Sequence, residues 1–437
     1  MRHILQAIVA CFVLLSCSDD PAAPPPHVTA TFLEVTAADY TSLTLELRTT
    51  ELREDVTYRL TRDGMQVWEG ALTGEDTLIT DTGLTASSGY RYKAYALQHG
   101  SMYDSSEAVL ARTRDTTSGD FTWELTVLGD YPSLLRDVYM ISPTDVWAVG
   151  KVTYIAPDTR NGYIIYNALH WDGVKWDTLQ VPTTESLPGG IQRRWFEEEM
   201  FSVYATSPSD VWFIGEYGGV CRWKDNGWYE MQPPFNQGPL RANGVWGTSD
   251  DLVLATWGAG IRGWNGSEFY SILDNDEIGG VYAQDVWGMD DTALVIAGDE
   301  SYRLDSKVYR VFEGTTIPFP SDSLKRGMVT LWFDRTDMIF AGGSQLSIWH
   351  DGAWHNHGVN KNWGFIKHIR GVAENDVVAV GAFATVLHYS GLSWQTYPEI
   401  DPDRRMHFQA VTYDGEYIYA VGENTNGRAV IIHGKRK

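Results

Sequence analysis

The chain has 437 residues, 43% of them hydrophobic and 13% aromatic, a composition that indicates a folded protein with more than one core and excludes a predominantly disordered chain. Its 34 Lys and Arg residues are outnumbered by 57 Asp and Glu residues, which gives a formal net charge of −23 at pH 7. Because so negative a field repels phosphate groups, nucleic acid is excluded as a general partner.

Residues 1–16 have the pattern of an export signal. Arg2 and His3 precede an apolar run from Ile4 to Leu15 that only Gln6 interrupts. Such a run is too short to cross a bilayer and is typical of a cleaved signal peptide. We therefore expect the mature protein to begin after this segment.

The segment "LLSC", which ends at Cys17, resembles the lipoprotein box of bacteria. The resemblance implies cleavage before Cys17 and acylation of this residue, which anchors the protein in a membrane; the alternative is an ordinary signal peptide with a chance cysteine. Ser18 and the acidic residues behind it resemble sorting signals of outer-membrane and surface-exposed lipoproteins. These features predict an outer-membrane lipoprotein of the cell envelope, facing either the exterior or the periplasm. Within residues 17–26, the run Pro21–Pro26 is expected to form a stiff tether.

The chain contains three cysteines. Cys11 lies in the signal segment and Cys17 is the lipidation candidate, so Cys221 has no partner for a disulfide within the mature chain. We expect Cys221 to be a small buried apolar residue.

Residues 27–115 are expected to fold as a small antiparallel β-sandwich. Segments such as "SLTLELRT", "VTYRLTRDG" and "YRYKAYAL" alternate polar and apolar residues, with Gly and Asp at the turns. The stretch "LTASSGYRYKAYA" resembles the tyrosine-corner segment of fibronectin type III domains, with Leu84 and Tyr90 at the matching positions, although the proline usual in that corner is missing. The resemblance implies a spacer or contact module.

Residues 116–437 contain an internal repeat. An apolar strand, a tight turn with Asp, a second strand that closes on Gly and a "W-D-G-x-x-W" turn recur, as in "VYMISPTDVWAVG" and "VYATSPSDVWFIG". The period is about forty residues and each unit reads as four short strands, a combination typical of β-propeller blades. The sequence therefore predicts an all-β chain in which a sandwich is followed by a seven-bladed β-propeller.

The seventh unit reaches the end of the chain at "AVIIHGKRK" without a fourth strand. The segment Phe121–Leu128 carries Trp123, precedes the first inner strand, and has no third strand of its own in front of it. We expect this segment to pair with "AVIIHG" and close the ring, an arrangement that also protects both sheet edges.

The turns in "HWDGVKW", "WHDGAW" and "HYSGLSW" resemble those of bacterial propellers of the BNR or Asp-box-like kind. In such a turn Asp or Ser caps the backbone, Gly adopts angles that other residues avoid, and Trp packs between blades. The pattern indicates a fold and carries no catalytic meaning.

Loop lengths predict where function lies. In an antiparallel blade, the first-to-second and third-to-fourth connections share one face, and the remaining connections share the opposite face. The former are short throughout, whereas the latter include two insertions in the first blade, residues 151–167 and 183–200. Because binding surfaces are built from long loops on a rigid scaffold, we expect function on the long-loop face.

This face collects cationic and aromatic residues, and the predicted ligand-binding set is Tyr163, Arg193, Arg194, Trp195, Arg241, Trp363, Arg404 and Arg405. The same loops also carry Lys325, Arg326, Lys361 and Lys367. In an acidic chain, such a rim would suit an anionic glycan or an acidic protein surface, with tryptophans as stacking platforms. The alternative is that these are solvated loop charges, offset by Glu197, Glu198, Glu199, Asp401 and Asp403.

The sequence predicts no catalytic, cofactor or metal site. His350, His355 and His357 are close in sequence, but no acidic or cysteine partner completes a metal-binding set. The leading hypothesis is a membrane-anchored, non-enzymatic module that binds a glycan or a protein. The alternative is a glycan-degrading hydrolase or lyase that uses the same face, for which no carboxylate pair can be identified. The oligomeric state stays open.

Overall fold

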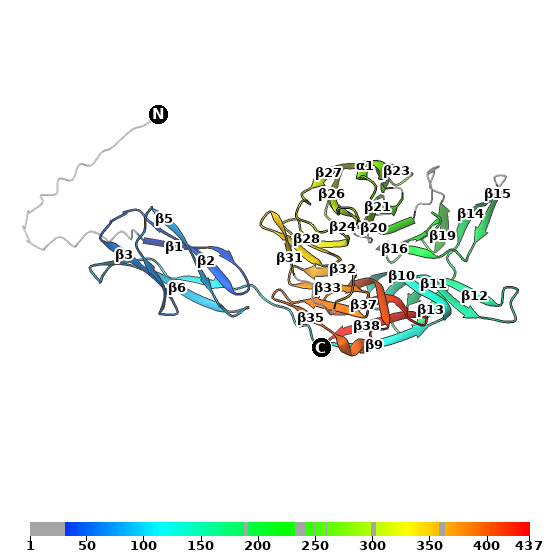
Figure 1. The fold of residues 1–437 in the computed structure, drawn as a ribbon, viewed down its shortest axis with the longest axis horizontal. Coiled ribbons are helices and arrows are strands. Elements are labelled where there is room, and N and C mark those ends of the chain that lie inside the picture. The colour runs from blue at the N-terminus through cyan, green and yellow to red at the C-terminus, as the bar shows by residue number, and fades with distance from the viewer. Residues whose placement is uncertain are drawn as a thin grey trace, which may run out of the picture. The chain divides into compact units, whose positions relative to one another are not determined.

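The computed structural model describes residues 31–187, 191–231, 241–248, 250–258, 260–298, 303–357 and 363–437. The predicted signal peptide, Cys17, the tether and Lys361 lie outside the described residues. The chain divides into two compact units, with the boundary between Arg114 and Asp115. Regular structure in both units is almost entirely β-strand (Figure 1). In the part of the chain that is described, no helix is long and apolar enough to cross a membrane.

The first unit contains two antiparallel sheets around one core. Apolar residues alternate with polar ones along its strands, so that each sheet buries one face; Leu43, Leu45 and Leu47 of β2 pack with Tyr58 and Leu60 of β3. One sheet has the order β1-β2-β5, and the other has the order β4-β3-β6-β7, with β8 also paired to β6. The strands are β1 (Thr31–Ala38), β2 (Ser42–Thr49), β3 (Val56–Arg62), β4 (Met65–Gly70), β5 (Asp76–Thr82), β6 (Gly89–Gln98), β7 (Ser101–Ser105) and β8 (Val109–Arg112).

The second unit forms, among its described residues, seven four-stranded antiparallel sheets. The first strand of each sheet lies beside the first strand of the next sheet, and β36 lies beside β10, so the sheets make a closed ring (Figure 1). Sheet 1 consists of β10 (Asp130–Ser142), β11 (Asp145–Ile155), β12 (Tyr163–Trp171) and β13 (Trp176–Leu179). Sheet 2 consists of β16 (Met200–Ser207), β17 (Asp210–Gly215), β18 (Val220–Lys224) and β19 (Gly227–Met231). Sheet 3 consists of β20 (Arg241–Thr248), β21 (Asp251–Trp257), β22 (Gly260–Trp264) and β23 (Phe269–Leu273).

Sheets 4 to 7 continue in chain order, with the short helix α1 (Asn275–Ile278) before sheet 4 and the 3-10 turn η1 (Pro398–Ile400) before sheet 7. Sheet 4 consists of β24 (Tyr282–Met289), β25 (Thr292–Gly298), β26 (Lys307–Phe312) and β27 (Thr315–Phe319), and sheet 5 of β28 (Met328–Arg335), β29 (Met338–Gly343), β30 (Leu346–His350) and β31 (Ala353–Asn356). Sheet 6 consists of β32 (Ile366–Ala373), β33 (Asp376–Gly381), β34 (Thr385–Tyr389) and β35 (Trp394–Thr396). Sheet 7 consists of β36 (Met406–Tyr413), β37 (Tyr417–Asn424), β38 (Ala429–Arg436) and β9 (Phe121–Leu128).

The ring is closed by a strand from its own beginning. β9 pairs antiparallel with β38, from Leu128 opposite Ala429 to Phe121 opposite Arg436, and the two strands lie together near the carboxy terminus (Figure 1). The predicted pairing of Phe121–Leu128 with the last strand is therefore confirmed. Arg436 also donates two hydrogen bonds to the Asp376 carboxylate of sheet 6, at 2.6 and 2.8 Å, so the closing strands are tied to the neighbouring sheet.

The repeated Asp residues act as local clamps. In the "W-D-G-x-x-W" turn of sheet 1, Asp172 accepts hydrogen bonds from the backbone N–H groups of Val174 and Lys175 at 2.8 and 2.9 Å, and Gly173 has φ 92°. The Asp that opens the second strand of sheets 1, 2 and 6 instead reaches across its sheet to a basic side chain on the third strand. These pairs are Asp145 with His170, Asp210 with Arg222, and Asp376 with His388.

The two insertions of sheet 1, which were expected as loops, are mostly β-hairpin. β11 and β12 stay paired out to Ile155 opposite Tyr163, and Thr183–Leu187 (β14) pairs with Ile191–Trp195 (β15). Both segments are rich in β-branched and aromatic residues in alternation, which favours strand pairing over an irregular loop. The β14–β15 hairpin projects from the ring beside β19 (Figure 1).

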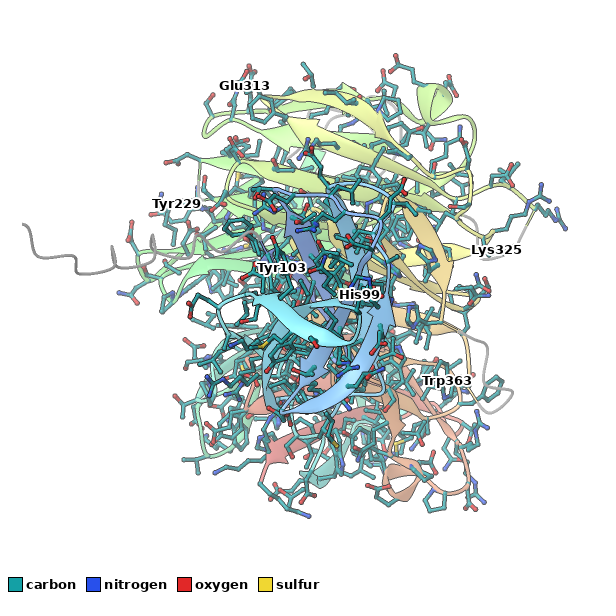
Figure 2. The ribbon with its side chains drawn as sticks, turned by 90° about the vertical axis from the view of Figure 1, so that its left-hand side faces the viewer. His99, Tyr103, Tyr229, Glu313, Lys325 and Trp363 are labelled. Atoms are coloured by element: carbon teal, nitrogen blue, oxygen red, sulfur yellow. The ribbon has the colours of Figure 1, made fainter. Side chains whose placement is uncertain are left out.

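The two faces of the ring differ as the loop lengths predict. We call the face with the second-to-third and sheet-to-sheet connections the long-loop face, and the opposite one the short-turn face. Lys325 and Trp363, from sheet-to-sheet connections, lie on one side of the second unit, and Glu313, from the tight β26–β27 turn, lies on the other (Figure 2). The chain reaches the ring on the short-turn face, where Asn375 Nδ2 donates to Asp115 O at 2.6 Å and Thr117 N donates to Ser390 O at 3.3 Å.

Candidate functional site

The first strand of every sheet in the ring contains a β-bulge at the corresponding position. In β16, for example, Met200 pairs with Gly215 and Ser202 pairs with Ile214, so Phe201 has no partner on β17. A bulge of this kind bends the strand and redirects the extra side chain. The bulged residues of sheets 1 to 7 are Arg136, Phe201, Asn243, Gln284, Val329, Lys367 and Gln409.

All seven bulged residues line one cavity of 420 Å³. The cavity lies on the axis of the ring, because every sheet contributes to it through its first strand. Phe201 and Lys367 are the second residues of β16 and β32, and these strands start from sheet-to-sheet connections on the long-loop face. The cavity is therefore the mouth of a central channel on that face. Its other lining residues are Asp137, Arg241, Tyr282, Asp285, His368 and Ala410.

Cationic side chains gather around the mouth. The guanidinium groups of Arg136 and Arg241 lie over the Phe201 ring, at 4.5 and 3.7 Å from its centroid, and Lys367 Nζ lies 5.2 Å from the Phe365 centroid. Arg136 also forms an ion pair with Glu199 at 2.6 Å. An Arg over an aromatic face is held by cation–π attraction and keeps its donors available around the ring edge.

The channel wall is crossed by a hydrogen bond at every junction between neighbouring sheets. Side-chain donors and acceptors on the first strands link each sheet to the next, and this fixes the spacing of the bulged residues around the mouth. The bonds, from the junction of sheets 1 and 2 onward, are Ser202 Oγ to Asp137 (3.0 Å), Tyr204 Oη to Gly247 O (2.7 Å), Asn243 Nδ2 to Ala283 O (3.2 Å), Thr330 Oγ1 to Asp285 (2.7 Å), Ile369 N to Thr330 Oγ1 (3.1 Å), Val411 N to His368 Nδ1 (3.0 Å) and Met140 N to Thr412 Oγ1 (3.3 Å).

Two carboxylates lie in this wall and differ in their electrostatic surroundings. Burial raises the pKa of Asp137 to about 6, although the backbone N–H groups of Val203 and Val138 donate to it. Burial also acts to raise the pKa of Asp285, but the charge of Arg370 and the hydrogen bonds from Arg370 and Thr330 together outweigh it, so the net pKa is lowered. Arg370 binds both oxygens of Asp285, at 2.9 and 3.0 Å.

His368 contributes no positive charge at neutral pH. Burial, and then the nearby Arg370 charge, lower the pKa of its imidazole to about 3. Its Nδ1 accepts the Val411 N–H, so the ring serves as a neutral link between sheets 6 and 7.

The mouth continues into the ring. A second cavity of 180 Å³ shares Asp137 and Asn243 with the mouth, and a third of 560 Å³ on the short-turn face shares Tyr139 and Tyr204 with the second. The rings of Tyr139 and Tyr204 are in edge-to-face contact with centroids 5.0 Å apart. Three cavities that share lining residues therefore follow one another from the long-loop face to the short-turn face, with charged and amide groups at the long-loop end.

The predicted binding residues occupy several separate places. Arg241 lies at the mouth, as does Lys367 from the wider cationic group. Arg193, Arg194 and Trp195 lie on the projecting β14–β15 hairpin, where Arg194 pairs with Glu230 of β19 at 2.5 Å. The Trp195 ring lies against Tyr217, with centroids 5.8 Å apart. The hairpin is tied to the outer strand of sheet 2, and its residues do not line the channel cavities.

The other predicted residues also lie away from the mouth. Tyr163 is exposed at the end of the extended β11–β12 hairpin, and Trp363 packs against the core between sheets 5 and 6. Arg404 donates to Phe383 O at 3.1 Å, and Arg405 pairs with Asp403 at 3.0 Å, both between sheets 6 and 7. The predicted set therefore does not converge on one site.

Sequence reasoning missed the bulged residues apart from Lys367. They sit at one column of the repeat, just before Asp137, Ser202, Asp285, Thr330 and their equivalents. A column that carries Arg, Phe, Asn, Gln, Val, Lys and Gln within otherwise apolar strands was the available signal. Simple alternation does not reveal this column, because it assigns every side chain of a strand to one of two faces and makes no provision for a bulge.

Other candidate chemistry has structural explanations. Cys221 is fully buried in the core between sheets 1 and 2, as expected, and burial raises the pKa of its thiol to about 12. The rings of His350 and His355 stack with centroids 3.9 Å apart. Across the described ranges, no group of three or more His, Cys, Asp or Glu residues is placed to hold a metal ion.

Comparison with solved structures identifies β-propeller proteins as neighbours. A structure of YCF48 bound to a D1 peptide is similar to this chain with a TM-score of 0.52 and 14% identity, over 74% of this chain and 99% of that chain. The WD40 β-propeller domain of Doa1 follows with a TM-score of 0.49 and 13% identity, over 73% of this chain and 98% of that chain. At such low identity the likeness shows the fold alone, that of a β-propeller. No protein-family model matches the sequence, and no curated protein matches it.

Proposed function

We propose that this protein is a lipid-anchored binding module of the bacterial outer membrane. In this proposal Cys17 carries the lipid, the first unit is a fibronectin type III-like spacer, and a seven-bladed propeller binds a glycan or protein ligand at the channel mouth without transforming it. The oligomeric state is not part of the proposal.

The assignment of seven blades is supported by the repetition of one design around the ring. Each of the seven sheets has four strands and a bulge on the first of them, and each is linked to its neighbours across the channel wall. The β9–β38 pairing supplies the fourth strand of the last blade. The BNR-like character rests on the Asp and Gly of the turns, as at Asp172 and Gly173.

The fibronectin type III-like assignment is supported by the corner that carries Tyr90. The Tyr90 hydroxyl accepts a hydrogen bond from the Thr85 backbone N–H at 2.8 Å, which is the contact that defines a tyrosine corner. Leu84, beside it, is buried in the core of the two sheets. The lipoprotein assignment rests on the sequence of residues 1–20 alone.

The observation that carries the binding proposal is the convergence of seven bulged side chains on one cavity. A volume of 420 Å³ lies in the range of ligand sites, and the lining combines cations, amides and an aromatic residue on a rigid ring. A protein of the same fold, YCF48, has been solved with a D1 peptide bound. That example makes peptide recognition by this fold a reasonable starting point for experiment.

The binding test uses the chain from Ser18 onward, which keeps every described residue. It is applied to a glycan array and used as bait for peptide and protein ligands. The variant Gln409→Trp places a bulky side chain in the mouth without changing charge, and we expect it to abolish specific binding while the melting temperature stays close to that of the wild type. Arg194→Ala with Trp195→Ala is the matched variant on the hairpin. Loss of binding in the hairpin variant and not in Gln409→Trp would place the ligand elsewhere on this face.

The anchor is tested separately. When cells that express the full chain are grown with a labelled fatty acid, the protein should become labelled. The variant Cys17→Ser should not be labelled and should no longer be recovered with outer membranes. Unchanged labelling of Cys17→Ser would refute the lipoprotein assignment.

The alternative, a glycan-degrading hydrolase or lyase, has one observation in its favour, which is the raised pKa of Asp137 at the mouth. Against it, Asp137 accepts hydrogen bonds from Ser202 and Val203, and the other lining carboxylate, Asp285, is occupied by Arg370. Release of reducing ends from anionic polysaccharides by the wild type, lost in Asp137→Asn, would favour the enzyme over the binding module.

A further inference from the structure

An exposed aromatic pair lies beside sheet 2 on the long-loop face. Trp195 ends the second strand of the β14–β15 hairpin, and Tyr217 lies in the connection between β17 and β18. Tyr217 is 65% exposed and Trp195 is half-buried, and their ring centroids lie 5.8 Å apart with an angle of 37° between the planes. At this angle the rings are closer to a common surface than to an edge-to-face pair, in which the edge of one ring caps the face of the other.

A buried carboxylate fixes the two segments that carry these rings. Glu198 is 2% exposed and accepts hydrogen bonds from the backbone N–H groups of Tyr217 and Gly219, at 2.8 and 3.3 Å. It is also hydrogen-bonded to the side chain of Thr183, the residue that pairs with Trp195 in the hairpin. The pair is therefore held in place before a ligand arrives, which lowers the entropy cost of binding.

Two further carboxylates flank the pair. Glu197 and Glu216 are partly exposed, and neither forms an ion pair with another described residue. Burial and, to a smaller extent, the charge of Glu216 raise the pKa of Glu198, so Glu216 lies close to the turn that carries Tyr217. Carboxylate oxygens accept hydrogen bonds from hydroxyl groups, and their negative charge disfavours an anionic ligand. Aromatic faces attract the weakly positive C–H groups of a sugar ring.

A cation would also be attracted to aromatic faces and carboxylates. Sites for ammonium groups enclose the cation between several rings, whereas the planes of Trp195 and Tyr217 differ by only 37°. The neighbouring Phe196 ring already has the Arg194 guanidinium over it, at 5.4 Å from its centroid. The geometry therefore favours the flat ring of an uncharged sugar over a cation.

We propose that Trp195 and Tyr217 form a stacking site for one residue of a neutral glycan, with Glu197 and Glu216 accepting hydrogen bonds from its hydroxyl groups. Glu198 is a positioning residue, because it is buried and acts through the segments that it holds. The site is separate from the channel mouth, so the inference adds a second ligand to the proposed function and does not depend on it.

The test measures binding of neutral hexasaccharides to the chain from Ser18 onward by isothermal titration calorimetry. The probes are cellohexaose, laminarihexaose, maltohexaose, xylohexaose and mannohexaose, with oligogalacturonate as the anionic control and hexalysine as the cationic control. Tyr217→Ala removes the exposed ring, whereas Tyr217→Phe keeps its face. Phe383→Ala is the matched control, because Phe383 is 53% exposed at the equivalent position of sheet 6.

We expect at least one neutral hexasaccharide to bind saturably, with a loss of about tenfold or more in affinity in Tyr217→Ala and in Trp195→Ala. Tyr217→Phe and Phe383→Ala should change the affinity by no more than about twofold, because the first keeps the ring face and the second lies outside the site. The melting temperature of Tyr217→Ala should stay close to that of the wild type, since the side chain is exposed.

Four results would overturn the site. They are the absence of binding to all five neutral probes, an equal loss in Phe383→Ala, an equal loss in Tyr217→Phe, and binding of oligogalacturonate or hexalysine in place of the neutral sugars. If Gln409→Trp, which fills the mouth, also abolishes sugar binding, the sugar belongs to the mouth; the inference then fails and the proposed function stands. The proposed function fails instead if Gln409→Trp leaves the binding of every ligand unchanged.

Discussion

Removing Arg370 from its ion pair with Asp285 should strongly destabilise the ring. Both side chains are buried, with 13% and 3% of their surface exposed, and the pair joins sheet 6 to sheet 4 across the channel wall. Arg370→Met keeps the length of the side chain and its packing over Trp287, but it leaves the Asp285 charge buried without its cation. Removing one partner of a buried pair costs about 3–5 kcal/mol, and we expect a loss of that size.

The assay is urea unfolding, with tryptophan fluorescence as the signal. Of the 18 tryptophans, only Trp68 lies in the first unit, so the signal reports mainly on the ring. Asp285→Asn should also destabilise, and the double variant should unfold closer to the wild type than the sum of the single losses, because it leaves no unpaired charge. Arg326→Met breaks an exposed pair with Asp305 and should cost no more than about 1 kcal/mol.

Two results would refute this reasoning. The first is that Arg370→Met unfolds at the same urea concentration as the wild type, which would mean that the Asp285 charge is solvated or protonated at little cost. Alternatively, the losses in the double variant could be strictly additive, in which case the two side chains would stabilise the ring independently and not through their pairing.

Three further predictions concern pH, ring closure and the turns. Because the pKa of Asp137 is raised to about 6 in the folded protein, protonated Asp137 stabilises the fold at low pH, and this stability is lost as the pH rises from about 4 through about 6. Asp137→Asn should flatten this part of a profile of melting temperature against pH. An unchanged profile would assign the titration to another group. Arg436→Ala leaves the Asp376 carboxylate without its two guanidinium hydrogen bonds, so we expect a loss of about 3 kcal/mol in thermal unfolding and earlier proteolysis near the carboxy terminus; equal protease resistance would show that β9 alone holds the ring closed. Asp172→Ala removes two backbone hydrogen bonds from an exposed turn and should cost only about 1 kcal/mol by urea unfolding, and a loss as large as that of Arg436→Ala would contradict a purely local role.

Much of the fold was predictable because its strands and turns depend on residues that are close together in the sequence of each repeat. Asp172 and Gly173 specify a turn through their own backbone chemistry, and the alternation in Phe121–Leu128 indicates a strand that needs a partner. Since the last unit lacked a fourth strand, pairing β9 with β38 was the arrangement that left no edge open. The insertions of sheet 1 were predicted less well, because their alternating residues extend strands where length alone suggested loops.

The candidate site was not predictable in the same way. Arg193 and Arg194 are adjacent to Trp195 in sequence and looked like one binding surface, yet hairpin pairing places them beside the outer strand of sheet 2. Arg241 and Lys367 looked unrelated, yet both line the mouth.

By itself, then, the sequence determined the strands, the turns, the repeat and the strand that closes the ring, because each depends on neighbouring residues or on one missing partner. Only the tertiary structure decided which side chains meet on the axis. A bulge exists only when two strands are paired, and ring closure alone brings together seven bulged residues that are about forty positions apart in the chain.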